Sequence, residues 1–168
     1  FTNKAAREMG ERVRALLGKE ARGLHISTFH RLGLDILQKE HLAAGLRRNF
    51  TVFDARDGAT LVKELSKQED EAMVRQLQAQ ISAYKNANIS AAAAKSLAQD
   101  EAQVLAAHIY HHYDQRLRAY NAVDFDDLIA LPLALLKEND TVRERWQHRV
   151  RYLLVDEYQD TNDCQYAL

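Results

Sequence analysis

Hydrophobic residues recur every three to four positions along most of the chain, and this spacing predicts a largely helical protein. The first amphipathic stretch predicts a helix from about Ala5 to Leu17, with Thr2 or Asn3 as its N-cap and Gly18 as its end. From residue 31 to about residue 118 one helical stripe follows another, with one candidate strand at residues 50–53. We therefore expect a long helical region in the middle of the chain.

Two segments near the ends of the chain have the pattern of strands. Residues 24–30 alternate in strand fashion, and Tyr152-Leu153-Leu154-Val155 is a short apolar run typical of a buried strand. Between them, Asp124 is placed to cap a helix that runs from Leu128 to about Glu138, and Asp140 opens a last short helix. Strands at both ends with helices between them predict an α/β fold.

The adjacent carboxylates Asp156 and Glu157 follow the apolar run directly. In an open parallel sheet, ligands bind beyond the carboxyl ends of the strands, so this pair is placed for a site and not for the core. One carboxylate is suited to hold Mg²⁺ through water, and its neighbour to accept a proton from an attacking water. The alternative for the pair alone is an acidic turn after an edge strand.

Charge is unevenly distributed. The net charge is −1, but residues 1–50 carry ten Lys and Arg against five Asp and Glu, and the rest carry thirteen against nineteen. A nucleic-acid contact is therefore expected to be local and to begin in the first third of the chain. With one cysteine and no apolar run near the ~20 residues of a membrane span, we expect a cytoplasmic protein without membrane contact. The start at Phe1, without Met, suggests an excised fragment.

The start of the first helix brings Thr2, Asn3 and Lys4 together with free backbone N–H groups, which suits phosphate contact. The alternative is a well-capped surface helix.

Thr28, Phe29 and His30 lie together at the tip of the first predicted strand, where they suit phosphate contact, base stacking and a hydrogen bond respectively. Taken alone, Phe29 is more typical of a core aromatic at the junction of strand and helix. Phe125, between the acidic residues of the Asp124 segment, is either a core staple or an exposed stacking platform.

Taken together, four segments resemble, in order, four motifs of superfamily 1A DNA helicases of the UvrD, PcrA and Rep group. They are Phe1-Thr2-Asn3-Lys4-Ala5-Ala6-Arg7-Glu8-Met9, Ile26-Ser27-Thr28-Phe29-His30, Asp124-Phe125-Asp126-Asp127-Leu128-Ile129 and Leu154-Val155-Asp156-Glu157-Tyr158-Gln159-Asp160-Thr161-Asn162. The stretch Arg145-Trp146-Gln147 looks most similar to the Rep branch. The resemblance covers essentially the whole chain.

The resemblance implies an ATP- and Mg²⁺-dependent motor. By similarity, Asp156 holds Mg²⁺, Glu157 activates the water that attacks the γ-phosphate, and Gln159 links the nucleotide state to the DNA surface. It also implies single-strand contacts at residues 1–4, at residues 28–30 and at Phe125.

The same resemblance implies the fold and its domains. Residues 1–30 and 119–168 are expected to form parts of a RecA-like motor domain 1A of the P-loop NTPase type, with a partial parallel sheet. Residues 31–118 are expected to form a large all-helical insertion, domain 1B. Implied partners are single-stranded DNA, single-strand to double-strand junctions and the remaining helicase domains of the same chain.

The chain contains no Gly-x-x-x-x-Gly-Lys-Thr/Ser loop to hold phosphates. We therefore expect the parent protein to be a helicase that translocates 3′ to 5′ in replication or repair, and this chain alone to be inactive. Two alternatives stay open: part of a helicase-nuclease of the RecB or AddA type, or a DNA-binding or helical interaction module without catalysis.

Overall fold

The computed structural model describes residues 2–168, so Phe1 and its expected DNA contact lie outside the described residues. Most of these residues are helical. In chain order the elements are α1 Asn3–Leu17, the 3-10 helix η1 Gly18–Ala21, α2 Phe29–Lys39, β1 Thr51–Val52, α3 Ala55–Ser66, α4 Glu71–Asn86, α5 Ala91–Leu97, α6 Glu101–Tyr120, β2 Ala122–Val123, α7 Asp127–Glu138, α8 Asp140–Arg149, the 3-10 helix η2 Tyr158–Asp160 and α9 Asp163–Ala167.

Local capping chemistry sets several helix boundaries as predicted, but the N-cap residue of α7 is Asp126 and not the predicted Asp124. The Thr2 hydroxyl accepts the backbone N–H of Ala5 at 3.1 Å and starts α1, and Gly18, with φ +54°, ends it. Asp54 and Asp57 form a reciprocal capping box at the start of α3. These contacts lie within a few residues of each other, which is why the sequence alone could place them.

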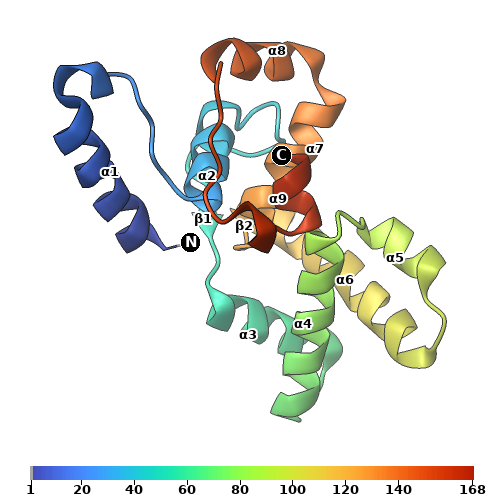
Figure 1. The fold of residues 1–168 in the computed structure, drawn as a ribbon. Coiled ribbons are helices and arrows are strands. Elements are labelled where there is room, and N and C mark those ends of the chain that lie inside the picture. Colours follow the sequence, from blue (N-terminus) through green and yellow to red (C-terminus); the bar gives the residue numbers. More distant parts are fainter. Residues whose placement is uncertain (1) are drawn as a thin grey trace.

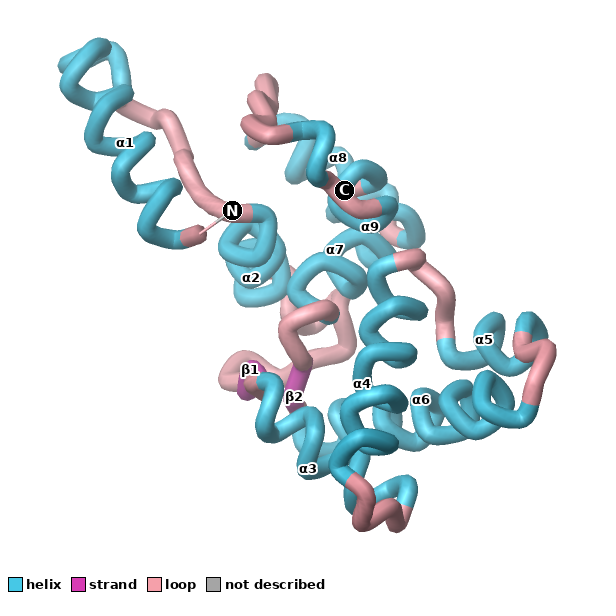
Figure 2. The backbone as a smooth tube through the Cα atoms, turned by 60° about the horizontal axis from the view of Figure 1, so that its bottom comes forward, coloured by secondary structure: helices cyan, strands magenta, loops and turns pink. Residues whose placement is uncertain are grey.

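The middle of the chain forms a helical unit around one apolar core. Helices α3, α4, α5 and α6 surround buried side chains that include Leu61, Leu77, Ile81, Ile109 and Leu117. Figures 1 and 2 show these helices grouped on one side of the molecule, away from α1 and α8, while α7 contacts α4. The predicted succession of helices is confirmed here.

A two-stranded parallel sheet joins the helical unit to the rest of the chain. Thr51 pairs with Ala122 and Val52 with Val123, and Val123 is fully buried. The candidate strand at residues 50–53 is therefore confirmed as β1. Parallel pairing requires a long crossover, and α3 to α6 supply it.

Helix α2 packs against α7 and α8, and α7 also packs against α9. Ile36 of α2 lies in one core cluster with Leu135, Val142 and Trp146, while Leu37 lies in another with Val123. Residue 30, the expected boundary of the helical insertion, falls inside α2. The division into domains 1A and 1B therefore stays a prediction.

The closest approach of α2 and α7 depends on Gly33. A Cβ atom added at this residue would lie 1.6 Å from the backbone oxygen of Leu128. Pro132 has no N–H to offer that oxygen four residues earlier in α7, which leaves the carbonyl group free to face α2. Gly33 thus lets α2 lie directly over an opening in the hydrogen-bond ladder of α7.

Replacing Gly33 with Ala is expected to lower the free energy of unfolding by at least about 1–3 kcal/mol, because backbone must move to admit the methyl group. Gly10→Ala in α1 is the matched control, since its nearest neighbour is the flexible Arg14 side chain at 3.5 Å. This control should gain up to about 1 kcal/mol from helix propensity. Chemical denaturation of both variants measures the difference, and equal stabilities would contradict the role of Gly33.

Both strands predicted near the ends of the chain are wrong in this structure. Residues 24–28 and 152–155 pair with no strand in the described part of the chain, and residues 29 and 30, predicted to end the first strand, begin α2. Tyr152 and Leu154 are 92% and 97% exposed, so the second segment is not buried either. A strand exists only when a neighbour accepts its backbone hydrogen bonds, and the local pattern cannot supply that neighbour. Among residues 2–168 the sheet consists of the β1–β2 pair, and the expected RecA-like sheet stays a prediction.

Helix α1 stands away from the other helices, as Figures 1 and 2 both show. Its apolar stripe stays largely open to solvent, with Met9 38% and Leu16 84% exposed. No helix among residues 2–168 is long and apolar enough to cross a membrane.

Candidate functional site

The start of α1 and the start of α2 meet at an open pocket of about 390 Å³. Five of the predicted DNA-binding residues line it: Thr2, Asn3, Thr28, His30 and Phe125. They come from three segments that are far apart in the sequence. The structure therefore brings most of the expected single-strand contacts to one place.

Backbone polarity at this pocket favours anions. Thr28 caps α2 by accepting the N–H of Arg31 at 3.2 Å, as Thr2 caps α1. The Thr28 hydroxyl also lies 3.5 Å from the side-chain oxygen of Asn3, which joins the two helix starts. Both helices thus direct the positive ends of their dipoles and their free N–H groups toward the same region, an arrangement suited to phosphate.

An aromatic pair lies beside the two helix starts. The rings of His30 and Phe125 stack with centroids 3.9 Å apart and planes 20° apart. Burial lowers the pKa of His30, and the nearby carboxylate of Asp126 opposes the shift only in part. The imidazole of His30 is therefore neutral at pH 7. The neighbouring Phe125 is 58% exposed. A flat, exposed ring with a neutral ring behind it is suited to stack on a nucleobase.

The Phe29 ring faces another environment. Phe29 is partly buried against the cluster of Ile129, Leu133 and Cys164, which joins α7 to α9. This packing favours the core role that the sequence left open, and base stacking by Phe29 stays a prediction. Lys4 is 77% exposed at its side chain and lies 3.9 Å from Glu8.

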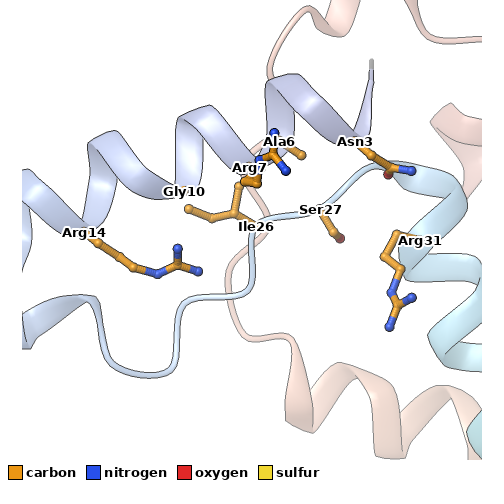
Figure 3. A pocket seen from close by; sticks show the side chains of 8 residues that line it. All are labelled: Asn3, Ala6, Arg7, Gly10, Arg14, Ile26, Ser27 and Arg31. Atoms are coloured by element: carbon orange, nitrogen blue, oxygen red, sulfur yellow. The ribbon is translucent and has the colours of Figure 1, made fainter.

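A second, smaller pocket of about 260 Å³ continues along α1, and arginine side chains dominate it. Figure 3 shows Arg7 and Arg14 extending from α1, with Arg31 at the start of α2. Arg31 is paired with Asp35 at 3.2 Å, whereas Arg7 and Arg14 form no salt bridge within residues 2–168. Sequence reasoning found the basic bias of this third of the chain but not these two residues as a lining.

The predicted catalytic residues form a local, solvent-exposed group. The backbone N–H of Glu157 donates to the Asp156 carboxylate at 3.0 Å, and the Gln159 amide donates to the Glu157 carboxylate. Glu157 adopts the left-handed conformation with φ +51°, so the chain turns sharply after the extended segment. Among the described residues, no side chain outside this turn bonds to the three residues.

A buried charge cluster supports the segment that carries Phe125. The Lys85 ammonium, at the end of α4, lies 2.7 Å from one oxygen of Asp124 and 2.7 Å from one oxygen of Asp127. Its side chain is 2% exposed. Burial alone would lower the pKa of Lys85, but the two carboxylates outweigh it and raise the pKa above its usual value.

A family model described as the UvrD/REP helicase N-terminal domain matches residues 1–168. The chain belongs to the UvrD/REP helicase family. Similar relatives are the ATP-dependent DNA helicase Rep of Salmonella typhimurium, 54% identical over 172 residues, and that of Escherichia coli, 53% identical. ATP-dependent DNA helicase PcrA of Leuconostoc citreum is 40% identical over 173 residues.

Each of these alignments covers the whole of this chain but only 26%, 26% and 23% of the respective relative. The chain thus spans about a quarter of the length of the UvrD/REP helicases that it matches. The resemblance drawn from the four motifs is confirmed at the level of the family.

The residue that sequence reasoning missed in this UvrD/REP domain is Lys85. Its signal was present in the sequence, because Leu77, Ile81 and Lys85 recur every four residues along the buried face of α4. A lysine in an apolar stripe needs a buried acidic partner, and Asp124 and Asp127 supply it.

Proposed function

We propose that this chain is part of an ATP-dependent DNA helicase and that it contributes a single-strand contact surface and the acidic residues for ATP hydrolysis. Two kinds of relatives carry the name ATP-dependent DNA helicase, which supports a DNA substrate and the use of ATP. The proposal extends to 3′ to 5′ translocation, to unwinding at single-strand to double-strand junctions, and to replication or repair as the setting. The remaining helicase domains are the proposed intramolecular partners.

The observation that carries the proposal is the stacked pair of His30 and Phe125 beside the two helix starts. A single strand needs a flat surface for a base and hydrogen-bond donors for the adjacent phosphate, and both are found within one open pocket. Arg7 and Arg14 extend the positive charge along α1. The strand is proposed to run from the aromatic pair toward these arginines.

ATP is proposed to bind with Mg²⁺ near the acidic turn. Asp156 and Glu157 fit a hydrated Mg²⁺, because both are exposed carboxylates with no cation beside them in the described residues. The ion would neutralise charge on the phosphates, with Asp156 as the residue that holds it. Glu157 would orient the attacking water and take its proton, and the Gln159 amide would hold the Glu157 carboxylate in place. Because the sequence has no phosphate-binding loop, the chain alone is proposed to be inactive.

The proposed arrangement narrows the expected 31–118 insertion of type 1B to the helical unit of α3 to α6, and assigns α2 with α7 and α9 to a RecA-like domain 1A. Two separate core regions support this division.

Replacing Phe125 with Ala in the intact protein is expected to weaken single-strand binding by about 1–3 kcal/mol, which corresponds to roughly 5- to 150-fold in Kd. Titration of a fluorescent oligothymidine at fixed salt measures the change. Tyr120→Ala is the matched control, because its ring is also exposed and stacked on a neighbour, Phe53, at 6.4 Å, but lies at the end of α6. The control should bind as the unaltered protein does.

Equal affinities for the Phe125 and Tyr120 variants would contradict base stacking at this pocket. Failure of the unaltered protein to bind single-stranded DNA would contradict the proposed function itself.

A further inference from the structure

A chain of side-chain hydrogen bonds joins the Phe125 segment to the residues that follow the acidic turn, and Asn86 lies at its centre. The Asn86 amide donates to the Asp126 carboxylate at 2.9 Å. Its oxygen accepts from the Asn162 amide at 2.6 Å. Asn162 in turn accepts the backbone N–H of Gln165 at 2.8 Å and caps α9.

The direction of every bond in this relay is fixed by its two ends. The Asp126 carboxylate only accepts, so the nitrogen of Asn86 must face it. The backbone N–H of Gln165 only donates, so the oxygen of Asn162 must face α9 and its nitrogen must face Asn86. Both amides therefore have one orientation that satisfies all partners, and reversing Asn162 would lose two bonds and reversing Asn86 three.

Several contacts hold the two asparagines of the relay in place. The bonds of the relay measure 2.6–2.9 Å, and both Asn86 and Asn162 are half-buried. The Asn86 amide also donates to the backbone oxygen of Ser82 at 2.9 Å, which anchors it to α4. A displacement of the Phe125 segment must therefore break the relay or move the start of α9.

Lys85, the residue before Asn86, also bonds both to the segment that carries Phe125 and to α9, through other atoms. The Lys85 ammonium holds Asp124 and Asp127, and its backbone oxygen accepts the Cys164 thiol at 3.0 Å. Burial raises the pKa of Cys164, so the thiol keeps the proton that it donates. The end of α4 thus bonds both to the turn that carries Phe125 and to the helix that follows the acidic turn.

We propose that Asn86 is a positioning residue that couples the single-strand platform at Phe125 to the acidic turn at Asp156 and Glu157. This inference rests on the proposed function, since it assigns the two ends of the relay to DNA and to ATP. Binding of a base to Phe125 shifts the segment that carries it. The hydrogen bonds of Asn86 then transmit this shift to Asn162, two residues after Asp160. The helical unit thereby becomes part of the connection between the two sites.

The test uses the intact protein and measures ATP turnover without DNA and at saturating oligothymidine. Asn86→Ala removes both links, and Asn162→Ser removes only the amide donor, because the Ser hydroxyl still caps α9. Gln78→Ala is the matched control, since this half-buried amide lies on the same helix and, within residues 2–168, bonds only to the backbone oxygen of Ala55.

The expected result is a loss of DNA stimulation by roughly 2- to 30-fold in the Asn86 and Asn162 variants. Turnover of the Asn86 variant without DNA should stay within about twofold of the unaltered protein, and the Gln78 variant should keep full stimulation. Combining the Asn86 and Asn162 changes should cost no more than either alone, because both break the same relay.

Full stimulation in the Asn86 variant overturns the inference, as does a combined loss equal to the product of the single losses. If the Asn86 variant is less stable but saturating DNA stimulates it as much as the unaltered protein, the role of Asn86 is purely structural. That result also overturns the inference. Failure of the proposed function has a different signature, because the unaltered protein itself would then show no stimulation by single-stranded DNA.

Discussion

Replacing Glu157 with Gln in the intact protein is expected to slow ATP turnover by roughly 10²–10⁴-fold, the usual contribution of a positioned general base. Gln keeps the size of the side chain and loses only the ability to take the proton of the attacking water. Binding of Mg-ATP should change little, because Asp156, the proposed metal ligand, is unchanged. The residue is exposed, and its side chain bonds only to Gln159 among the described residues, so the fold should tolerate the change.

Single-turnover hydrolysis and nucleotide binding, measured side by side, separate the chemical step from affinity. Glu144→Gln provides the control, because Glu144 is an equally exposed glutamate on α8, away from the acidic turn. If the Glu157 variant hydrolyses ATP as fast as this control, Glu157 is not the general base.

Replacing Lys85 with Met is expected to lower the free energy of unfolding by about 3–5 kcal/mol, because it leaves two buried carboxylates without a counter-charge. Met fills nearly the same space, so the loss reports the charge and not a cavity. Lys63→Met is the matched control, since Lys63 pairs with Glu69 at 3.0 Å on the surface. Breaking that exposed pair should cost at most about 1 kcal/mol.

The penalty in the Lys85 variant should shrink as the pH falls. Burial raises the pKa of Asp127 to about 6 even with the ammonium of Lys85 beside it, and removing that ammonium raises the pKa further. A carboxyl whose folded pKa is raised stabilises the fold at low pH, and this contribution is lost as the pH rises through the folded pKa. Denaturation at pH 5 should therefore show a smaller difference from the unaltered protein than denaturation at pH 7.

Changing Asp124 and Asp127 to Asn in the Lys85 variant should recover part of the stability, since Asn still accepts the capping N–H groups of this turn. A Lys85 variant as stable as the Lys63 control at pH 7 would show that the buried charges are not balanced by Lys85.

Features that depend on neighbouring residues could be predicted well. The capping box of Asp54 and Asp57, the end of α1 at Gly18 and the start of α5 after Ser90 all involve contacts within a few positions. The apolar stripes placed α3, α4 and α6 for the same reason. The motifs also identified the helicase family, because family membership is a property of the sequence.

The strands show the limit of prediction from neighbouring residues. The pattern at Tyr152 to Val155 predicted a buried strand and was wrong, because whether such a segment becomes a strand depends on a partner elsewhere in the chain. The same pattern at Thr51 and Val52 did become a strand, because residues 122 and 123 lie alongside it after a crossover of four helices.

The sequence by itself determined the helices, their caps and the types of residue available for phosphate, base and Mg²⁺. Only the tertiary structure decided that Phe125 stacks on His30, that Phe29 packs inside, and that Lys85 and Asn86 bond to the turn beside Phe125. These contacts join residues at least 39 positions apart. They depend on how the helices pack, and no local spacing encodes that packing.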